Sequence, residues 1–173
     1  MASTQTAFTN NKPAKAVTTI IKAGLIAGTL DIATALVMFS IKTHKDPMIV
    51  FQYIASAAFG KAAYTGDVSF IVAGIAFHYI IAFSFTILFF LLYPRIKFMH
   101  NYPILAGLTY GIFVWLMMNL VVLPLTKLPP ITFNLQSAVP GTIVLMLAIG
   151  LPVSLIIHNY FSRNKRMIEN DVV

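Results

Sequence analysis

The sequence contains no cysteine. It therefore forms no disulfide, thiolate metal site or cysteine nucleophile. Acidic residues are also scarce: five Asp and Glu occur in 173 residues, too dispersed to form a paired-carboxylate site. A phosphate loop, a nucleophile elbow and an intramembrane protease motif are likewise missing. We therefore predict that the protein is not an enzyme, and we expect neither a cofactor nor a metal site.

Charged side chains as a whole are rare. They make up 10% of the sequence against 58% apolar residues, and the mean hydropathy is +0.84, whereas soluble domains carry about 25% charged residues. The net charge is +7, but the Lys and Arg residues flank the apolar runs and form no interleaved patch. This pattern is typical of membrane topology. It predicts contact with a lipid bilayer and no binding of nucleic acid.

Four apolar runs are long enough to cross a bilayer of about 30 Å as helices. We place these spans at about 20–41, 68–93, 103–125 and 138–161. The run at 47–60 is too short to span and carries a thin polar edge, which favours a short interfacial or re-entrant helix. The predicted fold is therefore an all-α, polytopic membrane protein with four transmembrane helices.

The predicted domain organisation is one transmembrane domain over 17–161. Residues 1–16 are polar and contain Pro13, so we predict a disordered cytoplasmic tail there, and residues 162–173 form a second cytoplasmic tail. Eight of the twelve Lys and Arg fall on the side of the termini and four on the other side. By the positive-inside rule both termini are expected in the cytoplasm.

Asp31 is the one formal charge in the run 23–41 and lies near its centre. An acid at this depth costs roughly 2.5–3.5 kcal/mol on insertion scales, so it needs a partner. His78 and Asn119 are the deepest strongly polar residues of the second and third spans and lie at a similar depth. We predict an intramembrane polar cluster in which Asp31 pairs with His78 and Asn119 lies nearby.

Each of these polar residues follows small residues at helical spacing, a pattern typical of helix contacts. The predicted helix-packing residues are Gly24, Gly28, Gly74, Gly107 and Gly111. We expect the three strips to pack together around the polar cluster. Two interpretations of the cluster stay open: hydrogen bonding that holds the helices together, and a proton, ion or ligand site.

The other histidines do not support a metal site. His44 and His100 fall on predicted connections on opposite sides of the membrane, so the four histidines cannot share one ion. His158 lies at the cytoplasmic end of the last span, where we expect a solvated role at headgroup level.

Several stretches together resemble a known group of proteins. They are GLIAGTLDIATALV, FQYIASAAFGKAAYTG, HYIIAFSFT with LYPRIK, and YGIFVWLMMNLVVLPL. Over about residues 20–160 the chain resembles small four-helix bacterial inner-membrane proteins of unknown function common in the Bacteroidetes, and more distantly the YagU-like family. The resemblance implies a bacterial cytoplasmic membrane and at most a role in envelope or acid stress. It assigns no role to Asp31, His78, Asn119 or Pro124, which lie within these motifs.

The sequence favours a structural or accessory subunit of a membrane assembly. The alternative is a small oligomeric transporter or channel, proton-linked through Asp31 and His78. The expected partners are the lipid bilayer and either further copies of the chain or a larger membrane-protein complex.

Overall fold

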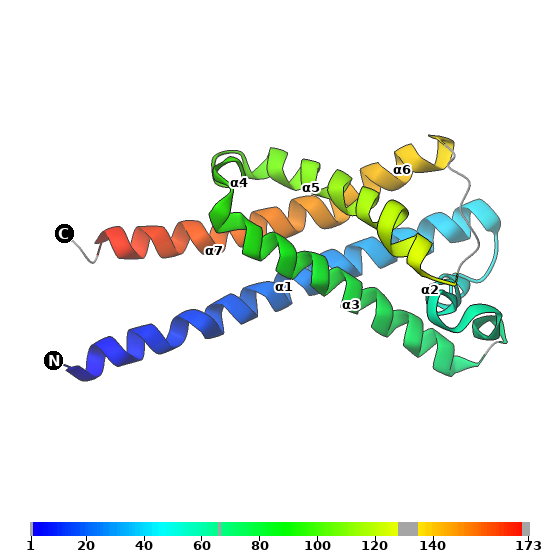
Figure 1. The fold of residues 1–173 in the computed structure, drawn as a ribbon, viewed down its shortest axis with the longest axis horizontal. Helices are drawn as coiled ribbons and strands as arrows, with labels where there is room; N and C mark the ends of the chain where they lie inside the picture. Colours follow the sequence, from blue (N-terminus) through cyan, green and yellow to red (C-terminus); the bar gives the residue numbers. More distant parts are fainter. Residues whose placement is uncertain (1, 66, 128–134, 171–173) are drawn as a thin grey trace.

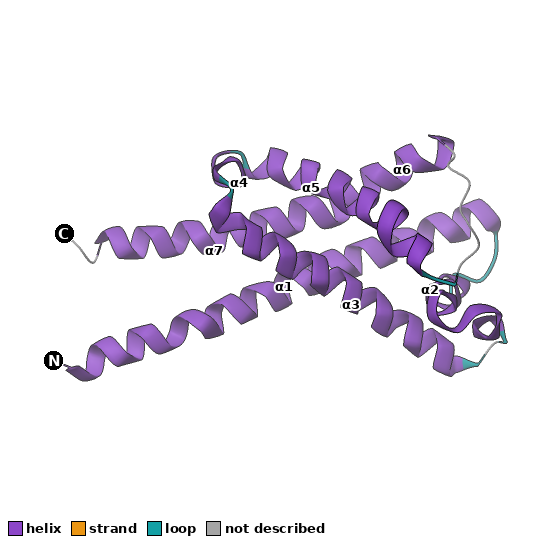
Figure 2. Ribbon diagram, viewed as in Figure 1, coloured by secondary structure: helices purple, strands orange, loops and turns teal. Residues whose placement is uncertain are grey.

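The protein is described here by a computed structural model over residues 2–65, 67–127 and 135–170. Within these ranges the chain is helical with no strand (Figure 2). In this described part of the chain, four helices are long and apolar enough to cross a membrane: Pro13–Thr43, Val68–Arg95, Pro103–Leu125 and Ala138–Asn164. A shorter helix lies between the first two. The predicted all-α class with four spanning helices is thus confirmed, and the four apolar helices fit an integral membrane protein.

The first helix, α1, is longer than predicted and runs from Ala2 to Thr43. The backbone of residues 2–16, where we expected a disordered tail, is helical, while residue 1 lies outside the described residues. Each residue added to an existing helix gains one backbone hydrogen bond, so α1 continues past its apolar part despite Pro13. The helix ends at His44, which adopts a left-handed conformation (φ 53°) and donates its N–H to the Ser40 carbonyl at 2.9 Å.

The short helix α2 (Ile49–Phe59) and the 3₁₀ turn η1 (Gly60–Tyr64) lie at the end of the bundle opposite the termini (Figure 1). Asp46 begins this segment by accepting the Met48 N–H at 2.9 Å. The ring of Phe59 packs against Phe70 of the next helix, with ring centroids 5.5 Å apart. The segment is thus held against the second span.

The second span, α3 (Val68–Leu92), begins at an N-cap. The carboxylate of Asp67 accepts the Ser69 N–H at 2.9 Å, and this hydrogen bond lowers the pKa of Asp67. The connection to α5 (Pro103–Met117) lies at the end where both termini lie (Figure 1). It consists of η2 (Tyr93–Arg95) and α4 (Lys97–Asn101).

The third and fourth spans each contain a π-helical segment followed by a proline. In the third, η3 (Met118–Val122) precedes η4 (Leu123–Leu125); in the fourth, η5 (Met146–Gly150) joins α6 (Leu135–Leu145) to α7 (Leu151–Asn170). Pro124 and Pro152 both stand two residues after the π segment. A proline offers no N–H and its ring clashes with the carbonyl four residues earlier. The wider π turn accommodates this conflict without ending the span.

Successive spans are joined by hydrogen bonds from a buried side chain to a backbone carbonyl. Three such bonds are His78 Nε2 to Gly28 (2.8 Å), Tyr110 Oη to Phe85 (2.6 Å) and Ser154 Oγ to Pro103 (2.6 Å). They link α3 to α1, α5 to α3, and α7 to α5. A helix carbonyl has a second lone pair, so it accepts these bonds without losing its helical partner. Inside a membrane such bonds satisfy buried polar groups and fix neighbouring helices.

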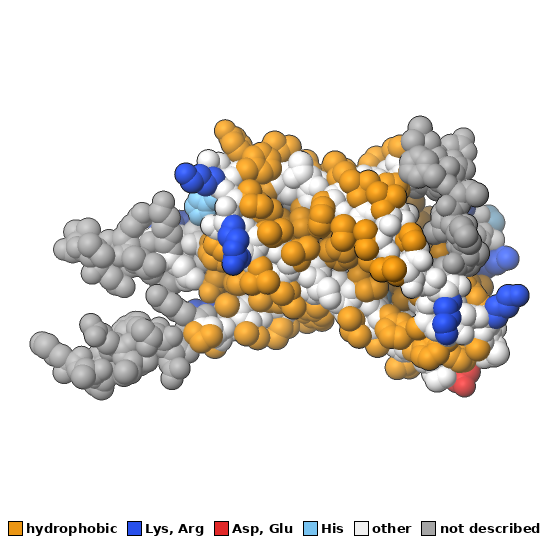
Figure 3. Space-filling model, in the orientation of Figure 1, with side chains coloured by type: hydrophobic (Ala, Val, Ile, Leu, Met, Phe, Trp, Pro, Cys, Tyr) orange, Lys and Arg blue, Asp and Glu red, His pale blue; other side chains and the backbone are white. Residues whose placement is uncertain are grey.

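The core lies between α3, α5 and the fourth span. Phe89, Val114 and Val153 are buried there, while large apolar side chains such as Leu120 and Ile80 face outward. Figure 3 shows an apolar middle with Lys and Arg toward both ends. This distribution is what contact with a bilayer requires.

Candidate functional site

His78 lies buried between α3 and α1. Its Nε2 is 2.8 Å from the carbonyl oxygen of Gly28. Because a carbonyl only accepts, Nε2 must carry the hydrogen. In the neutral imidazole Nδ1 is then an acceptor. The side chain that we predicted to pair with a carboxylate thus donates to the backbone.

Asp31 lies one turn beyond Gly28 on α1 and is half-buried. Residues three apart share a helix face, so its carboxylate lies on the side of α1 that His78 approaches. The two groups are close enough to interact electrostatically. Among the described residues, none donates a hydrogen bond to this carboxylate. The structure therefore brings Asp31 and His78 together as neighbours and leaves the acid without a donor from the described part of the chain.

Asn119 stands apart from this pair. It lies in η3 and its Nδ2 donates to the Trp115 carbonyl one turn earlier, at 2.8 Å. The described residues show no hydrogen bond between Asn119 and either Asp31 or His78. Its amide therefore donates within its own helix.

The five predicted helix-packing glycines all lie at contacts between segments, but not at one common junction. A Cβ on Gly24 would lie 2.5 Å from the Phe83 ring, and one on Gly28 would lie 3.1 Å from Tyr79, so both face α3. Gly74 instead faces the backbone of Phe51 in α2. Gly107 and Gly111 face the fourth span at Gly150 and Met146. The α1 strip meets the α3 strip at His78 and Ala82. The α5 strip faces the fourth span instead, so the expectation that all three strips pack together is wrong.

The α1–α3 contact around the acid contains a further hydrogen bond. Thr29 Oγ1 and Tyr79 Oη are 2.8 Å apart, and the same tyrosine ring packs over Gly28. The close approach of the two helices is what places the His78 imidazole against an α1 carbonyl.

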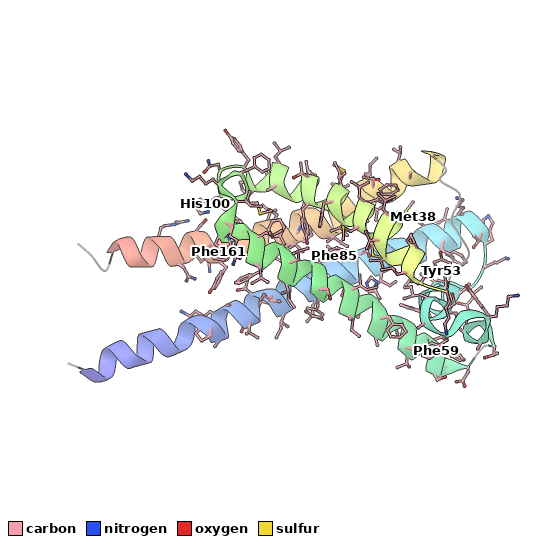
Figure 4. All side chains as sticks on the ribbon, viewed as in Figure 1. Met38, Tyr53, Phe59, Phe85, His100 and Phe161 are labelled. Carbon is pink, nitrogen blue, oxygen red and sulfur yellow. The ribbon has the colours of Figure 1, made fainter. Side chains whose placement is uncertain are left out.

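A second polar cluster was missed by the sequence reasoning. Tyr93, 2% exposed, has its hydroxyl 2.7 Å from Nδ1 of His158 and 3.2 Å from Nδ1 of His100. Its ring stacks on Phe161 with centroids 4.8 Å apart. Nε2 of His158 is 3.3 Å from the Ser162 hydroxyl. Figure 4 shows His100 and Phe161 at the end of the bundle where the termini lie.

The geometry of this cluster constrains its protons. The Tyr93 hydroxyl has one hydrogen, so it donates to one Nδ1 and accepts from the other. The network is complete when one of the two histidines carries hydrogen on Nδ1 and the other does not. The arrangement can hold a proton that is shared along a short chain of hydrogen bonds. A signal was present in the sequence. Tyr93 and His158 fall at the predicted cytoplasmic ends of two spans, and His100 falls on the predicted cytoplasmic connection.

Of the four histidines, only His100 and His158 lie together. His44 caps α1 at the end opposite His100 and His158, while His78 lies within α3. In the described part of the chain, no group of three His, Cys, Asp or Glu has the geometry to hold a metal ion.

No known protein family, curated protein or solved structure matches this chain.

Proposed function

We propose that this protein is an accessory subunit of an assembly in the bacterial cytoplasmic membrane and that it docks a partner on α1 beside Asp31, past the point where α3 contacts Gly28. The observation that supports this proposal is a half-buried carboxylate in a spanning helix that receives no hydrogen bond from the described residues. Such an acid costs roughly 2.5–3.5 kcal/mol in a bilayer. A donor from a partner helix would offset much of that cost.

His78 does not remove the need for such a donor. Its Nε2 hydrogen is bound to Gly28, and no hydrogen bond joins this imidazole to the carboxylate. The helix face beyond Asp31 is also open to close approach. Thr34 and Ala35 are half-buried and Met38 is 44% exposed. Small residues followed by a flexible methionine suit contact with another helix.

The proposal is tested by photocrosslinking in native membranes. A photoreactive residue replaces Met38 on the docking face or, as a control, Ile80 on the exposed side of α3. We expect a crosslink to a different polypeptide from position 38 and none from position 80. Asp31→Leu should remove the crosslink, whereas Asp67→Asn, which also loses one acid but lies outside the spans, should leave it unchanged.

Two results would contradict the accessory role. One is a crosslink that survives Asp31→Leu, because the acid would then play no part in docking. The other is a product of exactly two copies of this chain, which would point to an oligomer.

A second candidate function is proton-linked transport by such an oligomer. The observation that favours it is that two titratable groups, Asp31 and His78, are neighbours within apolar helices. Four helices leave little room for a pore within one chain, so several copies would be needed. Proton flux into liposomes over about pH 5–8 that stops on Asp31→Asn would support transport. Absence of flux over this range would exclude it.

We further propose that both termini face the cytoplasm. The excess of Lys and Arg at the end that carries the termini and α4 supports this orientation. A C-terminal reporter that is active only outside the cytoplasm should stay silent, and its activity would reverse the assignment.

A further inference from the structure

A cleft of about 800 Å³ opens between the first turns of the α1 span and residues 156–166 of α7. The two helices pack together deeper in the bundle and diverge toward the termini (Figure 1). Lys15 and Lys22 line the cleft from α1, and Arg163 and Arg166 line it from α7. All four are exposed, and Asn159 adds an amide.

The charged residues that the described part of the chain contributes to this cleft are all cationic. No carboxylate is among the described residues that line it. The hydroxyls of Thr18 and Thr19 on the same wall donate to carbonyls of their own helix. The cations are therefore the main donors that the cleft offers to a ligand, and like charges on two facing helices repel each other unless an anion lies between them.

We propose that this cleft binds the phosphate headgroup of an anionic phospholipid from the surrounding bilayer. Both walls belong to spanning helices near their ends, which is where headgroups lie. Basic pockets between transmembrane helices on the cytoplasmic side are suited to anionic headgroups. Arginine adds planar, bidentate hydrogen bonding to phosphate oxygens.

The surface that continues from the cleft along α1 toward the middle of the bilayer favours a lipid over a soluble phosphate. Ile26 and Leu30 follow Lys22 along α1 at steps of four residues and are 46% and 45% exposed. Residues four apart lie on one side of a helix, so these side chains continue from the cationic end toward the middle of the bilayer. They provide an apolar track for an acyl chain whose headgroup lies in the cleft.

The test is native mass spectrometry of the purified chain in neutral detergent. The probes are palmitoyl-oleoyl phosphatidylglycerol, which is anionic, and palmitoyl-oleoyl phosphatidylcholine, which is zwitterionic. The cleft variant carries Gln at the four cationic positions of the cleft. The control variant removes the same charge at the other end of the bundle, by Gln at Lys42, Lys45, Lys61 and Lys127.

We expect the wild type and the control variant to retain phosphatidylglycerol in preference to phosphatidylcholine. The cleft variant should lose about fivefold in phosphatidylglycerol affinity for each cation removed. Equal binding of the two lipids, or an equal loss in both variants, would overturn the proposal. Displacement of phosphatidylglycerol by inorganic phosphate would also overturn it, because the ligand would then be a soluble anion.

Folding is checked by the melting temperature in the same detergent. The altered side chains are exposed, so both variants should melt as the wild type does. If the fourfold cleft variant unfolds, the single variants Lys22→Gln and Arg163→Gln carry the test, with Lys61→Gln as their control. If neither of these single cleft variants weakens phosphatidylglycerol binding, the proposal is refuted.

Discussion

The crossing of the third and fourth spans at Gly150 offers a decisive test of the packing. A Cβ at Gly150 would collide with the carbonyl oxygen of Gly107, and backbone cannot rotate away as a side chain can. Gly150→Ala must therefore push the two helices apart. This separation would also stretch the hydrogen bond from Ser154 to the Pro103 carbonyl, now 2.6 Å long.

The expected cost follows from three contributions. Overpacking costs roughly 1–3 kcal/mol, and the weakened hydrogen bond costs about 1 kcal/mol. Alanine also stabilises a helix by about 1 kcal/mol relative to glycine, which offsets part of this cost. The net loss in the free energy of unfolding is thus roughly 1–3 kcal/mol, because the collision outweighs the gain in propensity.

Gly141→Ala is the matched control. A Cβ there would lie 3.4 Å from Nε1 of Trp115, an ordinary contact, so only the propensity gain remains. We expect it to stabilise by roughly 0.5–1 kcal/mol. The assay is reversible unfolding in mixed detergent micelles with increasing dodecyl sulfate. Equal effects of the two substitutions would refute the argument, since the same residue change would then be insensitive to its surroundings.

Three further substitutions each remove the hydrogen-bonding group of one side chain. His78→Phe removes the bond to Gly28 and should lower the free energy of unfolding by about 0.6–1.7 kcal/mol in the same assay, whereas unchanged stability would show that the bond contributes nothing. Tyr93→Phe should cost about 1 kcal/mol and alter the ¹⁵N shifts of both imidazoles that its hydroxyl now contacts; unaltered shifts would contradict the shared network. The Ser69 N–H lowers the pKa of Asp67, so this contribution to stability is complete above the unfolded pKa of about 3.9 and is lost as the pH falls below it. In Asp67→Asn the melting temperature should therefore depend less on pH in this acidic range than it does in the wild type. If the variant shows the wild-type dependence, Asp67 is not the cause of the loss of stability in acid.

The four spans could be predicted from the sequence because the hydropathy of a segment indicates whether it is suited to lipid or to water. A helix in lipid must be apolar over about 20 residues, and no other part of this chain meets that condition. The helical backbone of residues 2–16 was not predictable in this way. It depends on continuation from a neighbouring helix, whereas composition describes the segment by itself.

The polar cluster was predictable only in part, and helix geometry explains why. Successive residues are about 100° apart, so Asp31, seven residues after Gly24, returns to within about 20° of it. A step of four residues drifts by about 40°, and the three steps from Gly107 to Asn119 drift by about 120°. Asn119 therefore leaves the face that carries the glycine, and its amide bonds within its own helix.

The partner of each small-residue strip could not be predicted. Spacing identifies a face that allows close approach, but the crossing of helices decides which neighbour occupies it. Gly74 meets α2 while His78, one turn further along α3, meets α1. The meeting of Tyr93 with His158, 65 residues away, depends on the same tertiary arrangement.

The π segment η5 ends at Gly150, where the fourth span touches the third. From that contact to Arg163 the helix extends about 20 Å. A rotation of roughly 10° about the glycine contact would move the guanidinium end by about 3 Å, the length of one hydrogen bond. A change in the winding of these few residues deep in the bilayer would therefore change the separation of the two basic walls at its surface.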